Sequence, residues 1–202
     1  MIRLRLETEV KAGEPSEDDG LVVRWRIVVM KDHDDDTVEE VVGNVRASVV
    51  HYGEATNVGA ILDEAMADED LESVYDAFFD DEGWLRDTFD AQGQGLLYLD
   101  AIDLADEWRD RLIDLAVVRR LAQTLGMGCS LMVLNPAEMR RQREWSRMRF
   151  EVVSKPGPEP FLVLNLNRRT PRVRETADLD CFEVAPAPVT EGVGEGPGEG
   201  QK

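Results

Sequence analysis

Two arginines, Arg109 and Arg111, stand at the start of the amphipathic segment EWRDRLIDLAVVRRLAQTLG (107–126), directly after an apolar run. A helix N-terminus offers free backbone N–H groups and a partial positive charge, so it binds phosphate groups well. Guanidinium groups also bind phosphate, through paired hydrogen bonds. The residue types at this turn therefore predict a site for an anionic ligand.

Two other residues of the turn oppose such a ligand. Leu112 and Asp114 stand where phosphate-binding turns usually carry glycines, which let the main chain approach the phosphate closely. A carboxylate about 4 Å from a phosphate oxygen repels it by about 4 kcal/mol at an effective dielectric constant of about 20. Arg109 and Arg111 offset part of this repulsion. We therefore expect weakened anion binding, with the chain's own carboxylates in the place of the ligand.

Asp100 and Asp103 are the candidates for a general base. They belong to the apolar run GLLYLDAIDL (95–104), which we expect to form a central strand. Their odd separation puts them on opposite faces of a regular strand, so at most one of them faces a cleft. The alternative is that each is an exposed or capping carboxylate.

The acidic stretch DHDDD (32–36) has the composition of a calcium loop but not its register. Counted as an EF-hand loop from Asp32, the glycine position holds Thr37 and the final glutamate position holds Gly43. We interpret the stretch as a solvated hairpin tip, with a weak divalent-ion site as the alternative. Cys129 and Cys181 lack paired spacing and nearby histidines, so we expect reduced thiols and no metal site.

The sequence lacks the usual motifs of hydrolases. His51, beside Tyr52 in an apolar run, is the only histidine outside the acidic stretch, so a catalytic triad has no further support. No serine stands in a G-x-S-x-G context, and no Walker-type glycine loop is present.

The elements that must position these residues follow from hydrophobic periodicity. The first three strands suit an antiparallel meander, and the central strand, helix and strand suit a right-handed crossover between two parallel strands. Ligands of such sheets bind at the carboxyl ends of the strands. The expected elements are strands at 2–10, 21–30 and 44–52, helical spacing over 57–90, a strand at 95–104, a helix at 107–126 that a left-handed Gly126 ends, a strand at 129–136, a helix at 137–148, and strands at 149–154 and 160–166.

Charge is distributed unevenly along the chain. Residues 1–107 carry 8 basic and 29 acidic side chains, whereas residues 108–174 carry 14 and 6. With a formal net charge of −19, general nucleic-acid binding is excluded. The basic runs at 140–150 and 167–174 either hold a ribose phosphate or form a solvated face that pairs with the acidic half.

The composition suits one cytoplasmic domain. No stretch has the length and apolarity of a membrane span or a signal peptide, so we expect no membrane contact. We expect a single domain over residues 1–184 and a disordered Gly/Pro/Glu-rich tail over residues 185–202.

The order of elements and the segment LDAIDLADEWRDRLIDLAVVRRLAQTLG (99–126) together resemble the GNAT acetyltransferase superfamily. In that family the central strand ends in a segment like L-x-V-x-P-x-x-R, followed by Q/R-x-x-G-x-G/A. The matching residues are Ile102, Leu104, Trp108 and Arg109. The later segment REWSRMRF (143–150) resembles the family's Y-x-x-x-G-F, with Trp145, Arg149 and Phe150 at the matching places.

The resemblance implies a GNAT-like acyl-CoA N-acyltransferase fold, a mixed α/β sheet of about seven strands with helices on both faces. It also implies acetyl-CoA as the co-substrate. The backbone of Ile102, Asp103 and Leu104 would hold the pantetheine arm. The turn that would meet the pyrophosphate consists of Arg109, Asp110, Arg111, Leu112, Ile113 and Asp114.

The chain departs from the family's pattern at its functional positions. Leu112 and Asp114 replace the two glycines of the turn, and Arg149 stands where the family usually has glycine. Trp145 replaces a tyrosine that protonates the departing thiolate in many members. Indole donates a hydrogen bond but cannot act as a general acid near neutral pH.

Two functions follow as hypotheses. The resemblance implies an N-acetyltransferase that moves an acetyl group from acetyl-CoA to an amine of a small molecule or protein, with Asp103, Asp100 and Trp145 as candidate catalytic residues. The acidic region 55–92 favours a cationic acceptor. The alternative is a catalytically inactive GNAT-fold protein that acts as a binding or interaction module. The oligomeric state is left open.

Overall fold

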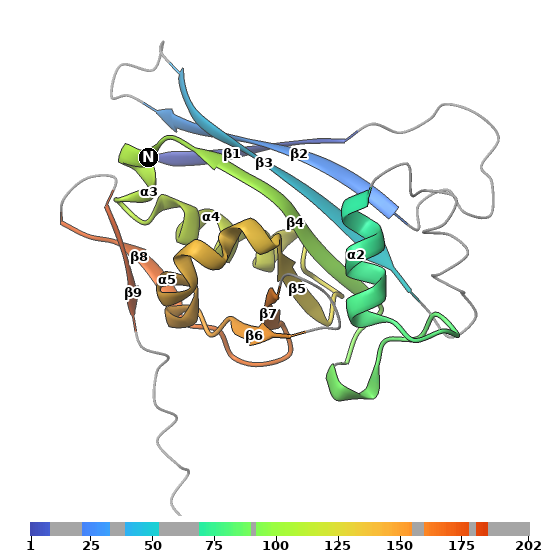
Figure 1. The fold of residues 1–202 in the computed structure, drawn as a ribbon. Coiled ribbons are helices and arrows are strands. Elements are labelled where there is room, and N and C mark those ends of the chain that lie inside the picture. Colours follow the sequence, from blue (N-terminus) through green and yellow to red (C-terminus); the bar gives the residue numbers. More distant parts are fainter. Residues whose placement is uncertain are drawn as a thin grey trace, which may run out of the picture.

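A seven-stranded mixed sheet forms the centre of the protein (Figure 1). The computed structural model describes residues 1–8, 22–32, 39–52, 69–89, 92–154, 160–177 and 181–185. The sheet has the order β1-β2-β3-β4-β5-β7-β6, in which only β4 and β5 pair in parallel. Its strands are β1 (Ile2–Thr8), β2 (Val22–Asp32), β3 (Glu39–His51), β4 (Gly95–Leu104), β5 (Leu131–Leu134), β6 (Glu151–Val153) and β7 (Phe161–Asn165).

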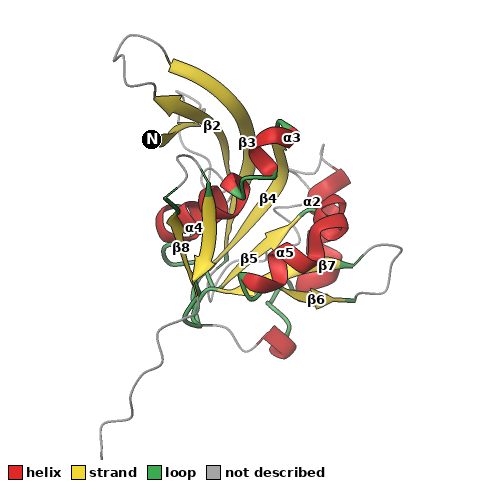
Figure 2. Ribbon diagram, turned by 90° about the vertical axis from the view of Figure 1, so that its left-hand side faces the viewer, coloured by secondary structure: helices red, strands yellow, loops and turns green. Residues whose placement is uncertain are grey.

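Helices cover both faces of this sheet, because alternate residues of the central strands are apolar on each side (Figure 2). Leu97 and Leu99 of β4 join a core with Leu115 of the crossover helix, whereas Leu96 and Tyr98 join a second core on the other face. Besides the 3-10 helices η1 (Asp87–Phe89) and η2 (Pro136–Arg141), the helices are α2 (Glu69–Phe78), α3 (Asp106–Arg109), α4 (Ile113–Thr124) and α5 (Gln142–Arg147). α2 packs on the Tyr98 face, and α3, α4 and α5 pack on the Leu97 face.

The N-terminal antiparallel meander and the parallel crossover are confirmed. β3 begins at Glu39, earlier than the predicted residue 44. A small sheet of β8 (Arg172–Glu175) and β9 (Phe182–Ala185) was not predicted, because each strand has only four residues and β8 is largely charged. The helix expected over 57–66, most of the acidic stretch 32–36 and the tail after Ala185 lie outside the described residues.

A β-bulge in β4 overturns one prediction. The register with β3 shifts between Arg46 and Ala47, which leaves Asp100 without a cross-strand partner. The side chains that face the α4 side of the sheet are therefore odd-numbered before the bulge, at Leu97 and Leu99, and even-numbered after it, at Ile102 and Leu104. As a result Asp100 and Asp103 lie on the same face of the strand. The prediction of opposite faces was wrong because it assumed a regular period of two.

The parallel strands β4 and β5 differ in length, and β5 ends beside the middle of β4. They pair only from Leu96 to Leu99 on β4, and the last hydrogen bond joins the Asn135 N–H to the Leu99 carbonyl at 3.0 Å. β4 then continues to Leu104 beside β3 alone, where Gly43 has no room for a Cβ against Leu104. The space beside the second half of β4 is therefore left for the residues that follow each strand.

Candidate functional site

The turn that follows β4 is two short helices, not one continuous helix. α3 ends at Arg109, Leu112 adopts a left-handed conformation with φ of 59°, and α4 begins at Ile113. The N–H of Leu112 donates to the Arg109 carbonyl at 3.0 Å, which closes the turn. The predicted single helix over 107–126 was wrong. The spacing of its apolar residues continues unchanged across the turn at 110–112, so hydrophobic periodicity does not reveal that the helix is interrupted there. Gly126 is also not left-handed; Gly128 has the positive φ, at 86°.

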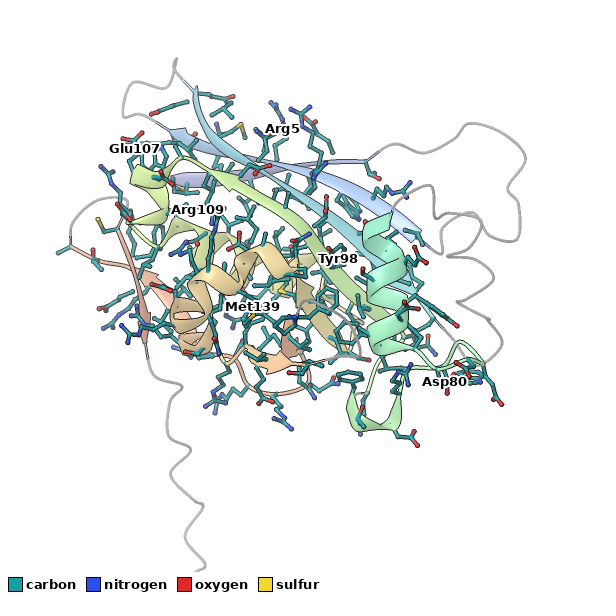
Figure 3. All side chains as sticks on the ribbon, viewed as in Figure 1. Arg5, Asp80, Tyr98, Glu107, Arg109 and Met139 are labelled. Carbon is teal, nitrogen blue, oxygen red and sulfur yellow. The ribbon has the colours of Figure 1, made fainter. Side chains whose placement is uncertain are left out.

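Arg109 points into the molecule and not toward solvent. It is 8% exposed, and its Nη1 lies 3.2 and 3.4 Å from the two carboxylate oxygens of Glu138. Its Nη2 donates to the carbonyl oxygen of Ile102 on β4 and to Glu138 Oε1. Figure 3 shows Arg109 inside, between β4 and the η2–α5 segment, with Glu107 of the same helix on the outside. The guanidinium therefore fills the space beside the second half of β4.

Glu138 lies on the other side of this space and forms the ion pair with Arg109. It is 4% exposed on η2, and Trp145 donates its indole N–H to Glu138 Oε2 at 3.2 Å. Trp145 is itself fully buried. Asn135 fixes the start of η2, because its side chain accepts from the Ala137 N–H and donates to the Tyr98 hydroxyl. The carboxylate is thus held by two donors from two elements.

A second buried pair lies beside the first. Arg141 of η2 forms an ion pair with Asp114, which lies in the first turn of α4 and has no exposed surface. Arg141 also donates to the Arg109 carbonyl at 3.4 Å. Among the described residues, Asp114 Oδ1 has no hydrogen-bond partner. Burial raises the pKa of Asp114 to about 6, although the positive charge of Arg141 acts in the opposite direction. We call Arg109, Glu138, Asp114 and Arg141 the charge quartet; its formal charge is zero.

The remaining predicted residues of the turn are distributed around the quartet. Asp110 is exposed, and the Ile113 side chain is fully buried. The Arg111 guanidinium lies 4.7 Å from the ring centre of Trp108, whose ring also has the Lys31 ammonium at 5.0 Å. The Arg111 carbonyl accepts from the N–H of Phe182 at 2.9 Å, so strand β9 is bonded to the turn. The side chains of Ile102 and Leu104 are buried in the core.

The three candidate catalytic residues do not form one group. Asp100 pairs with Arg46 at 2.9 Å on the α2 side of β4, and Asp103 is exposed on the same side. Trp145 belongs to the core on the opposite side. The strand itself separates the two carboxylates from the indole, so this arrangement gives no acid and base on one reacting atom.

Sequence reasoning missed Glu138 and Arg141, although they complete the quartet. Both lie in the helix expected over 137–148, and the basic run 140–150, which contains Arg141, was interpreted as a ribose-phosphate site or a solvated face. One signal was available: Glu138 and Trp145 are seven residues apart, which puts them on the same side of a helix two turns apart, and a buried tryptophan needs an acceptor for its N–H.

The part of the chain described here offers little other chemistry. It contains no group of three or more His, Cys, Asp or Glu side chains that could hold a metal ion. Burial raises the pKa of the Cys129 thiol to about 11, which disfavours the nucleophilic thiolate. Within the same residues, no helix is long and apolar enough to cross a membrane.

Comparison with known proteins does not supply a relative. No family model matches the chain, and no curated protein or solved structure matches it either.

Proposed function

We propose that this protein is a catalytically silent, GNAT-like binding or interaction module, whose cofactor space is filled by its own charge quartet. The observation that carries the proposal is the buried Arg109, which donates to the Ile102 carbonyl and to Glu138. In an acetyltransferase of this kind, that carbonyl and that arginine would serve the cofactor. Here each already has an internal partner.

Backbone conformation supports the GNAT-like part of the proposal. Among the described residues, the only non-glycine residues with positive φ are Leu112 at 59° and Arg149 at 70°. Both stand at positions where the two GNAT motifs carry glycine. Left-handed backbone costs an L-residue about 1–2 kcal/mol, so it is rarely adopted without a structural cause. The chain therefore keeps, at these two positions, the left-handed backbone conformation that glycine favours, although it has no glycine at either position. The seven-stranded mixed sheet with its one parallel pair agrees with the same resemblance.

The magnitudes favour a closed site. A diphosphate at the N-terminus of α4 would have to take Arg109 and Arg141 from their carboxylates. Breaking a buried ion pair costs about 3–5 kcal/mol, so two pairs cost about as much as the roughly 8 kcal/mol by which a micromolar ligand binds. Leu112 adds a side chain to the approach path, and the indole N–H of Trp145 is too weakly acidic to protonate a leaving thiolate at neutral pH.

Acetyl-CoA titration tests the proposal. We expect no heat of binding and no shift of the melting temperature up to about 1 mM cofactor at neutral pH, whereas a ligand at about 100 times its dissociation constant stabilises a fold by about 2.7 kcal/mol. Saturable binding by the unaltered protein, or acetylation of a polyamine or a lysine peptide above the rate without protein, would contradict the proposal.

Variants identify what closes the site. Glu138→Gln with Asp114→Asn removes both internal carboxylate charges and frees both arginines, and we expect measurable cofactor binding by this double variant if it remains folded. Glu107→Gln with Glu144→Gln removes two carboxylate charges outside the quartet, so it is the matched control and should bind no better than the unaltered protein.

N-acetyl transfer is the second candidate. It is favoured by the β4 bulge, which puts Asp100 and Asp103 on one face where an amine could lose its proton. It requires Arg109 to leave Ile102, so the same titration decides between the two functions.

A further inference from the structure

Three exposed arginines lie on the surface of η2 and α5. Arg143 and Arg147 are four residues apart and share one side of α5, and the exposed Arg140 lies on the preceding η2. We call them the arginine face. The opposite side of the segment is anchored in the core by Trp145 and Met148, neither of which has exposed surface. The three guanidinium groups therefore extend from a rigid support.

This face is not neutralised by the part of the chain that the structure describes. No carboxylate of these residues lies within ion-pair distance of Arg140, Arg143 or Arg147. Some exposed arginines are paired: Arg168 with Glu151, and Arg174 with Glu183. Arginines that the described carboxylates leave unpaired fit an acidic partner surface, because guanidinium and carboxylate form paired, charge-assisted hydrogen bonds.

An acidic surface with a matching apolar group lies elsewhere on the same chain. The turn after α2, residues 79–87, carries Asp81, Glu82 and Asp87, all exposed, around Trp84, which is 41% exposed. We call it the tryptophan turn. Its shape is fixed, because Asp80 accepts from the N–H groups of Glu82 and Trp84 at 3.0 and 2.9 Å.

The electrostatic field of the tryptophan turn is negative. Burial, and then the charges of Asp80, Asp81 and Asp76, raises the pKa of Tyr75. Arg86, the one basic residue within the turn, donates to the backbone carbonyl of Asp76. An indole with surrounding carboxylates suits a guanidinium group, which stacks on the ring and pairs with the acids.

We propose that the protein forms a two-fold dimer, in which the arginine face of each copy contacts the tryptophan turn of the other. Both surfaces lie on the half of the molecule that holds β5, β6 and β7, away from the N-terminal strands (Figure 1). A two-fold axis between them therefore lets both contacts form twice and closes the assembly. A second copy is the fitting partner because the chain itself supplies both complementary charges. The inference does not depend on whether the charge quartet admits a cofactor.

Sedimentation velocity over a concentration series, at about 0.15 M salt, measures the dimer directly. We expect a monomer–dimer equilibrium for the unaltered protein. Trp84→Ala should weaken the dimer about 30-fold, the effect of losing a typical interface hot spot. A monomer at all concentrations up to about 1 mM, or growth beyond the dimer, would overturn the proposal.

Charge exchange makes the test specific. Arg143→Glu with Arg147→Glu should yield monomers, and Asp81→Lys with Glu82→Lys should do the same. An equimolar mixture of the two variants should restore a heterodimer, since each altered surface then meets its complement. Continued self-association of either variant, or a mixture that stays monomeric, contradicts the proposed contact.

A matched control separates this contact from general repulsion. Arg120→Glu with Arg172→Glu reverses two exposed arginines on α4 and β8, and it changes the net charge by the same amount as the variant of the arginine face. We expect this control to dimerise as the unaltered protein does. If it is equally monomeric, net charge and not the arginine face governs association.

Discussion

Two arginine–carboxylate pairs flank the same stretch of β4, and they differ in almost every physical respect. Arg46 meets Asp100 at 2.9 Å on the α2 side, with 65% of the arginine side chain exposed. Arg109 meets Glu138 at 3.2 Å on the opposite side, with side chains only 10% and 6% exposed. Water and salt screen the charges of the first pair. In the second pair water is excluded, so each charge is stabilised mainly by its partner. The same two chemical groups therefore form a solvated surface pair on one face of the sheet and a buried pair within the core on the other face.

The largest expected difference is the cost of removing one partner. Glu138→Gln leaves the Arg109 charge buried and should lower the free energy of unfolding by about 3–5 kcal/mol, measured by urea denaturation. Adding Arg109→Met should recover much of this loss, because the double change leaves no unpaired charge and the introduced glutamine amide oxygen can still accept from the Trp145 indole N–H. A loss under about 1 kcal/mol for the single change would mean that the pair is hydrated like Arg46 and Asp100.

The next largest expected effect is the pH dependence of stability that the buried Asp114 causes. The pKa of Asp114 is raised from 3.8 to about 6, so between these values the folded protein keeps a proton that the unfolded chain has lost. Stability should therefore fall by about 3 kcal/mol as the pH rises from about 4 to 6, and this contribution should then stay level. The measurement is the difference in unfolding free energy between the unaltered protein and Asp114→Asn across this range. A difference that does not change with pH would show that water reaches Asp114.

A smaller effect separates backbone strain from charge. Arg149 is exposed and adopts φ of 70°, with one hydrogen bond from its side chain to the Arg169 carbonyl. Arg149→Gly should raise the melting temperature, with a gain of about 1 kcal/mol, because glycine adopts this conformation without steric cost. Arg149→Ala removes the same charge but keeps the strain, so it serves as the control and should give no gain.

The smallest effect is expected at the exposed pair. Arg46→Ala should change the free energy of unfolding by about 0.2–1 kcal/mol, and the change should shrink further at high salt. The check is denaturation at low and high ionic strength, beside Glu138→Gln under the same conditions. A salt-insensitive loss as large as that of the buried pair would remove the distinction between the two faces.

Much of the fold could be predicted because it is encoded by local patterns. The alternation in β1 indicates which of its sides is buried, and the apolar density of β4 indicates burial on both sides. β4 was predicted with its observed bounds. The failures lie where a pattern continues through a local change of backbone. The bulge at Asp100 and the left-handed Leu112 leave no mark in the spacing of apolar residues.

The candidate site was predicted only in half. Arg109 and Asp114 were found because they lie next to a strand that the pattern predicts. Their partners Glu138 and Arg141 are 29 and 27 residues further along the chain. No local rule pairs residues at such a distance, since the pairing depends on how β5 returns η2 to the space beside β4.

The sequence alone thus determined the alternation of elements, the crossover and the unusual charge of the turn, because each follows from side chains within a few residues of one another. Only the tertiary structure decided that Arg109 faces inward, that Glu138 receives it, and that Asp114 is buried against Arg141. The physical reason is desolvation: a charge takes a particular partner when packing excludes water from both, and packing is a property of the whole chain.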